Sequence, residues 1–134
     1  MAKAKARTSL RQIEELMANK SGILSKAQAL TTMGLPETAQ PLWASAASYE
    51  ERIAALLDAH GEGLEAAVHR ISAASCFQKA GDPSRATNLY RAALAGPLRE
   101  VTRREVEEML AECLALLVDG APRGAGNASA DSND

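Results

Sequence analysis

Aromatic residues are scarce in this chain, which has one Trp, one Phe and two Tyr among 134 residues. Leu, Ile, Val, Met and Ala must therefore fill the interior, and these residues suit close helix packing better than a β-sandwich or a barrel. We expect an all-α fold. The length supports one domain of about 100 to 110 residues with a single modest core.

Long apolar runs are also missing. No stretch approaches the roughly 20 apolar residues of a membrane-spanning helix, and the first twenty residues hold no run of signal-peptide length. We therefore expect a cytoplasmic protein without membrane association. The two cysteines, Cys76 and Cys113, each lie on the apolar side of a predicted helix. Buried free thiols are the expected interpretation, rather than a disulfide.

The net charge of −2 is small but unevenly placed. Residues 1–26 carry six basic and two acidic residues, giving +4, so the remainder is −6. An acidic body argues against a nucleic-acid-binding fold, and the basic segment lacks the interleaved aromatic residues that stack on single strands.

Residues suited to catalysis are few. There are two histidines, and His60 precedes a glycine at a predicted helix end, where a cation favours the helix dipole. His69 lies two helical turns from Cys76, about 10 Å away and too far to share one metal ion. Acidic pairs such as Glu50-Glu51 are adjacent and are expected on solvated helix faces. We expect no catalytic residue, no metal site and no cofactor.

The most informative stretch is a tight turn, Gly81-Asp82-Pro83, between two helical segments. Gly81 suits the left-handed position just after a helix, Asp82 suits an N-cap, and Pro83 fits the first turn of the next helix. The turn predicts an antiparallel helical hairpin.

A second, weaker copy of this hairpin lies 47 residues upstream, where residues 24–46 align with residues 71–93. Three aligned pairs keep a bulky side chain: Leu24 with Ile71, Leu30 with Phe77, and Trp43 with Tyr90. Seven residues are identical, at Ser25, Ala27, Gly34, Pro36, Ala39, Leu42 and Ala46 and again at Ser72, Ala74, Gly81, Pro83, Ala86, Leu89 and Ala93. A fixed self-similar period indicates a repeat array.

Apolar spacing and helix boundary signals predict about six helices. Their ranges are 9–19, 23–33, a third ending near residue 60, 64–80, 83–95 and 101–118. The third could begin at Pro36 or at Pro41. The later start is favoured, because a proline inside a helix costs roughly 3 kcal/mol. Thr102 and Glu105 predict a capping box at the start of the last helix.

The predicted domain therefore covers residues 9–118. Residues 1–8 would form a basic flexible arm, either disordered or a frayed extension of the first helix. Residues 119–134 are too poor in apolar side chains to fold and would form a disordered tail.

The order Ala74, Phe77, Gly81, Pro83, Ala86, Tyr90, Ala93 resembles the tetratricopeptide repeat. The resemblance covers residues 23–97, as two units at 23–60 and 64–97 closed by the helix at 101–118. It implies a short solenoid of helical pairs whose concave face binds a protein or a peptide. The positions that would face such a partner are Gln28, Thr32, Ser75, Gln78 and Lys79.

These observations favour a non-catalytic adaptor or scaffold. One alternative is a helical bundle that binds a small molecule or performs chemistry in its interior, using His69 and Cys76. Another is a structural or secretion-chaperone-like subunit that depends on a partner. The apolar stripe of the last helix could also pair two copies of the chain, through Val106, Met109, Leu110, Cys113, Leu114 and Leu117.

Overall fold

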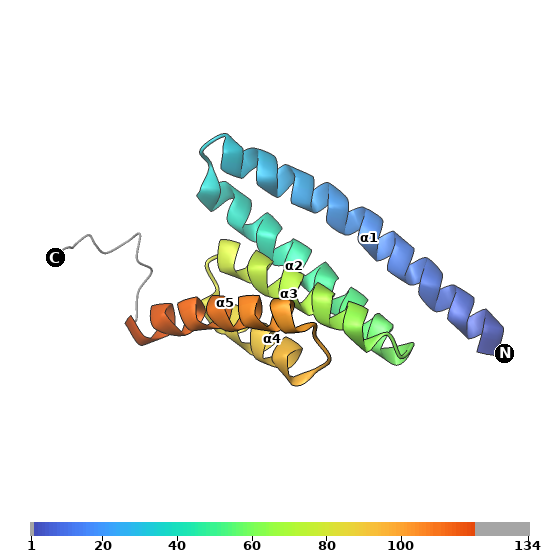
Figure 1. Ribbon diagram of the computed structural model, residues 1–134. Coiled ribbons are helices and arrows are strands. Elements are labelled where there is room, and N and C mark those ends of the chain that lie inside the picture. The colour runs from blue at the N-terminus through green and yellow to red at the C-terminus, as the bar shows by residue number, and fades with distance from the viewer. Residues whose placement is uncertain (1, 120–134) are drawn as a thin grey trace.

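The computed structural model describes residues 2–119, and this part of the chain is all-helical, as expected (Figure 1). The five helices are α1 (Ala2–Thr32), α2 (Pro36–Ala59), α3 (Gly63–Lys79), α4 (Pro83–Ala95) and α5 (Glu100–Asp119). Among the described residues, no helix is long and apolar enough to cross a membrane. Most of the tail predicted at 119–134 lies outside the described residues.

Each helix packs mainly on the helix before it and the helix after it in the chain. In Figure 1 the helices follow one another from α1 at one edge to α4 and α5 at the other. The larger core cluster lies where they meet and contains Trp43, Phe77, Tyr90, Val106 and Cys113. Fully buried alanines fill the space between these bulky groups and let the helix backbones approach closely.

Three of the four connections are the same short turn. Gly34, Gly61 and Gly81 each adopt a positive φ, at 81°, 76° and 81°. At the first of them the Gly34 N–H donates to the Thr31 carbonyl at 3.0 Å, and the Leu35 N–H donates to the Leu30 carbonyl at 2.9 Å. The same pair of hydrogen bonds recurs at the other two turns. This Schellman arrangement ends one helix and reverses the chain within three residues.

The turn at Gly81 has the predicted form. The Asp82 carboxylate accepts from the Arg85 backbone N–H at 3.1 Å, and Pro83 occupies the first turn of α4. A β-carbon added at Gly81 would lie 3.2 Å from the Gln40 amide of α2, so this turn also packs closely against a neighbouring helix.

The 47-residue period is also present in the side-chain contacts. The Trp43 indole N–H donates to the Thr31 hydroxyl at 3.3 Å, and the Tyr90 hydroxyl donates to the Gln78 amide oxygen. Residues 43 and 90 are one period apart, and so are residues 31 and 78. In each hairpin the buried aromatic ring therefore satisfies its polar tip on the preceding helix, at equivalent positions.

The predicted division of residues 9–33 into two helices is wrong, because α1 runs through Gly22 without a break. Leu16 on one side of this glycine and Ala27 on the other are both buried in core clusters that α2 shares. This packing outweighs the roughly 1 kcal/mol that glycine costs inside a helix. Residues 2–8 continue the same helix, which is the helical alternative considered for the arm.

The favoured start of α2 at Pro41 is wrong as well, because the helix begins at Pro36. Ala39 is fully buried in the core and its N–H donates to the Leu35 carbonyl at 3.1 Å, which requires helical backbone before Pro41. The Pro41 ring is exposed. Because proline has no backbone N–H, the helical hydrogen bond from residue 41 to the Glu37 carbonyl is missing, and this carbonyl lies in the exposed first turn of α2. Water can satisfy that carbonyl, which limits the cost of the proline.

The predicted capping box of α5 is also wrong, since this helix begins at Glu100 and Thr102 lies inside its first turn. The Arg103 side chain, in the first turn of α5, contacts the end of α4. It donates to the Leu94 carbonyl at 2.9 Å and to the Gly96 carbonyl at 3.3 Å. These bonds satisfy carbonyls at the end of α4 and tie the two helices together.

Two glycine-to-alanine substitutions are expected to change stability in opposite directions. Gly22→Ala should raise the free energy of unfolding by about 0.5 to 1 kcal/mol, because alanine favours a helix interior and its β-carbon would meet nothing within 4 Å. Gly34→Ala should lower it by about 1 kcal/mol or more, because of the positive φ. Urea unfolding followed by circular dichroism measures both, and a shift of the same sign in the two variants would contradict the helix boundary assigned here.

Candidate functional site

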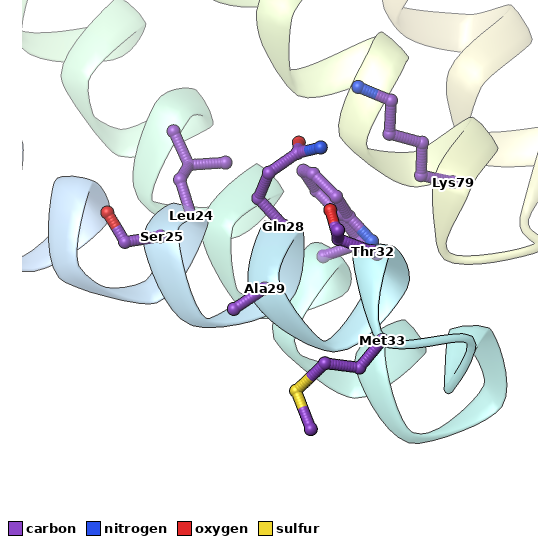
Figure 2. A pocket seen from close by; sticks show the side chains of 8 residues that line it. Leu24, Ser25, Gln28, Ala29, Thr32, Met33 and Lys79 are labelled. Atoms are coloured by element: carbon purple, nitrogen blue, oxygen red, sulfur yellow. The ribbon is translucent and has the colours of Figure 1, made fainter.

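A shallow groove of about 800 Å³ lies between α1 and α3 (Figure 2). We call it the α1–α3 groove. Trp43 of α2 also contributes to its lining. Its lining residues are Leu24, Ser25, Gln28, Ala29, Thr32, Met33, Trp43 and Lys79. The groove exists because α1 and α3 both pack on α2, so that α2 lies between them.

Figure 2 shows Gln28 and Lys79 reaching into the α1–α3 groove from opposite helices, while Met33 points away from Lys79. Trp43 is only 5% exposed, and the Lys79 ammonium lies over its ring, 4.6 Å from the ring centroid. This cation–π contact places a positive charge at the edge of an otherwise uncharged groove.

Lys79 has no carboxylate partner in the part of the chain that the structure describes. The salt bridges within residues 2–119 join Lys20 to Glu50, His69 to Glu50, and Arg70 to Asp58. None of the residues that line the α1–α3 groove is acidic. The groove therefore carries an uncompensated positive charge.

A stripe of residues along α3 connects this groove to a second hollow. The stripe, which we call the α3 face, follows helical spacing along one side and consists of Leu64, Val68, Ser72, Ser75 and Lys79. Leu64 is 45% and Val68 51% exposed. Both line a hollow of about 320 Å³ that also involves Leu98 and Arg99 just before α5 and Thr102 in its first turn. The surface is apolar at one end of α3 and cationic at the other.

The structure brings together three of the five residues that the sequence placed on the binding surface. Gln28, Thr32 and Lys79 all line the α1–α3 groove. Ser75 is half-buried on the α3 face, beside the groove rather than in its lining. Gln78 does not line the groove and is engaged with α4, where it accepts from the Tyr90 hydroxyl.

Sequence reasoning missed the apolar part of this surface. Leu64, Val68 and Trp43 were not among the residues predicted for the binding surface. Trp43 is indeed buried, but it also lines the groove. The four-residue spacing from Leu64 to Val68, followed by Ser72, was the available signal, because it places these residues on one side of the helix together with Lys79.

A buried carboxylate lies where α1, α2 and α3 meet. Glu50 is 3% exposed, and its oxygens lie 2.6 Å from His69 Nδ1 and 3.5 Å from Lys20 Nζ. The expectation that Glu50 belongs to a solvated face is therefore wrong. A buried carboxylate needs such partners, because its desolvation alone would cost several kcal/mol. These contacts also occupy Nδ1 of His69, one of the two residues in the interior-chemistry alternative.

Both cysteines are free and buried, as expected. Burial, with the nearby Glu50 charge, raises the pKa of Cys76 to about 11. Burial also raises the pKa of Cys113, against an opposing effect of the Thr87 hydroxyl. Both thiols are therefore protonated near neutral pH and weak nucleophiles. Within residues 2–119, no group of three or more His, Cys, Asp or Glu side chains is arranged to hold a metal ion.

The apolar stripe of α5 packs largely inside the protein. Val106 and Cys113 are fully buried, and Met109 and Leu110 pack against the same core cluster. Leu117 is 42% exposed. Most of the side chains suggested for pairing two copies are therefore engaged within one chain.

Comparison of the chain with models of known protein families, with curated proteins and with solved structures gave no match. The candidate surface is accordingly defined by the contacts within this chain: a cationic groove over Trp43, an apolar hollow at Leu64 and Val68, and the α3 face between them.

Glu50→Ala is expected to lower the free energy of unfolding by about 3 kcal/mol, because it leaves Lys20 and His69 in a largely buried site without their carboxylate. Asp58→Ala is the matched control, since it removes a carboxylate of the same helix that pairs with Arg70 at the surface. That change should cost no more than about 1 kcal/mol. Urea unfolding at neutral pH compares the free energies of unfolding of the two variants. Equal losses would show that burial of the Glu50 cluster adds nothing to its contribution to stability.

The cysteines are expected to react slowly with a thiol reagent in the folded protein. A rise in the pKa of Cys76 from 9.0 to about 11 lowers its thiolate fraction near pH 8 by about 100-fold. Absorbance with a disulfide reagent, with and without denaturant, measures the labelling rates. Fast labelling of the native protein would instead support chemistry at Cys76.

The same shift makes stability depend on pH. Because the pKa of Cys76 is raised on folding, the thiol contributes stability below about pH 9 that is lost as the pH rises toward 11.

Proposed function

We propose that this protein is a non-catalytic protein–protein interaction module, an adaptor or scaffold, that binds a segment of a partner on its helical-repeat surface. The observation that carries the proposal is the α3 face. It runs from two exposed apolar side chains, Leu64 and Val68, to the cation Lys79, which has no carboxylate partner among the described residues, and a hollow lies beside each end.

The position of α3 strengthens this interpretation. It is an inner helix of the array and packs against α2 on one side and α4 on another, so the fold could have covered apolar residues on either side. Leu64 and Val68 instead remain about half exposed on the α3 face. Adjacent exposed apolar residues with a polar rim are typical of protein interaction sites.

The repeated architecture supports the same function. Each helical pair buries one side against its neighbours and leaves an extended surface on the array. The equivalent contacts of Trp43 and Tyr90, one period apart, are consistent with such pairs. The resemblance to tetratricopeptide repeats agrees with this use, and we propose a cytoplasmic setting for it.

The alternatives draw less support from the geometry. Chemistry in the interior would need a free His69 or a reactive Cys76, yet Nδ1 of His69 contacts Glu50 and burial raises the pKa of the Cys76 thiol. A structural or chaperone-like subunit, or a homodimer through α5, would rely on the exposed end of that helix around Leu117 and Val118. Melting that depends on protein concentration would favour this second alternative.

Ser75→Glu is expected to abolish partner capture, because it places a bulky charge in the middle of the α3 face. Ser48→Glu makes the same change at an exposed position of α2, outside both hollows, and should leave capture intact. The immobilised wild-type protein and both variants are incubated with lysate of the source cell, and retained proteins are compared by quantitative mass spectrometry.

Circular dichroism melting establishes that both variants are folded. A partner retained equally by the Ser75 and Ser48 variants would move the binding surface away from the α3 face. Retention of no protein by the wild type would contradict an adaptor function.

A further inference from the structure

Building on the proposed function, we infer that the bound segment is acidic and amphipathic. A carboxylate side chain of the partner binds Lys79 in the α1–α3 groove, and an apolar side chain of the same segment fills the hollow at Leu64 and Val68. The inference thus assigns a partner chemistry and an orientation to the proposed surface.

The cationic end of the surface selects a carboxylate. Lys79 has no carboxylate partner among residues 2–119, and no acidic residue lines its groove. Its ammonium is already held over the Trp43 ring, so part of the entropy of ordering a lysine side chain has been lost before binding. The amide of Gln28 and the hydroxyl of Thr32 supply further donors in the same lining.

The opposite end selects an apolar side chain. The hollow there is lined by Leu64, Val68 and Leu98, and its two charged lining residues, Glu65 and Arg99, have opposite signs. The charges of these two residues therefore cancel. The main favourable contribution that a partner can obtain here is the burial of apolar surface. A neutral segment would lose the attraction of Lys79, and a basic segment would meet Glu65 only together with the like charge of Arg99 at this end.

The net charge of the whole chain opposes an acidic partner, but only weakly. The chain carries −2 in total. At physiological ionic strength, charges more than about 8 Å away are largely screened. The Lys79 ammonium at the edge of the groove, which has no carboxylate partner within residues 2–119, therefore decides the preference.

The spacing between the two ends bounds the bound segment. Val68 and Leu64 lie 11 and 15 residues before Lys79 in α3, or about 16 to 22 Å along the helix. A partner helix would span this distance in about 11 to 15 residues, and an extended chain in about five to seven. A peptide of about 16 residues is long enough in either conformation.

The first test selects peptides from a displayed library of random peptides of about 16 residues, a length taken from the spacing above. The wild-type protein is expected to enrich Asp or Glu at one position and Leu, Ile, Phe or Met at another. Lys79→Glu should lose the acidic preference, or exchange it for Lys or Arg, and keep the apolar one. Val68→Ser should lose the apolar preference and keep the acidic one.

The most enriched peptide is then synthesised with a fluorescent label and titrated by anisotropy. Lys79→Glu is expected to weaken its binding about tenfold, because attraction is replaced by repulsion. Lys26→Glu makes the same charge change at an exposed position of α1 outside the groove lining, and should change binding less than about twofold. Trp43 is the only tryptophan of the chain, and its fluorescence should change on addition of the unlabelled peptide.

The outcomes separate this inference from the proposed function. If no peptide is enriched by the folded wild-type protein, the acidic segment is overturned, while capture from lysate still decides the proposed function. If peptides are enriched without an acidic preference, or if Lys79→Glu retains that preference, the acidic partner is wrong while a binding surface remains. Equal weakening by the Lys79 and Lys26 variants would likewise show that the groove does not receive the carboxylate.

Discussion

The arrangement of the first three helices depends on one buried carboxylate. Glu50 of α2 faces Lys20 of α1 and His69 of α3, and its burial is tolerated because both neighbouring helices supply a partner. A shift of α1 or α3 along α2 by one turn, about 5 Å, would leave the carboxylate buried without these contacts. Apolar packing alone tolerates many similar arrangements, whereas this cluster distinguishes the correct register from its neighbours.

That register is also what forms the proposed binding surface. The Schellman turns at Gly34 and Gly61 reverse the chain twice, so α1 and α3 run in the same direction on either side of α2. With the register fixed, the C-terminal turns of both helices line one groove together with Trp43, and Lys79 lies above the Trp43 ring. The groove is thus a consequence of two short turns and one charged cluster, each encoded by a few residues.

Local signals in the sequence predicted those parts of the fold that local physics controls. Gly81, Asp82 and Pro83 have the predicted turn, cap and helix start, because backbone sterics and one side-chain hydrogen bond decide them. Tertiary contacts decided the rest. The burial of Ala39 favours a start of α2 at Pro36 rather than at Pro41. The hydrogen bond with Tyr90 keeps Gln78 out of the groove lining. Gln28 and Lys79 were predictable as exposed helix positions, but the packing of three helices was needed to bring them into one groove with Trp43.

The contact between Lys79 and Trp43 could compete with binding, since an ammonium held by a ring is already satisfied in part. The geometry removes most of this conflict. An ammonium has three N–H donors, and the ring face engages the cation from one side only. A carboxylate can approach from the open side of the shallow groove while the lysine stays over the indole. Partial shielding from water by Trp43 would then strengthen the ion pair, because the local dielectric is lower than that of bulk water. A core aromatic residue that also holds a surface cation in place thereby connects the stability of the fold to the proposed recognition of an acidic partner.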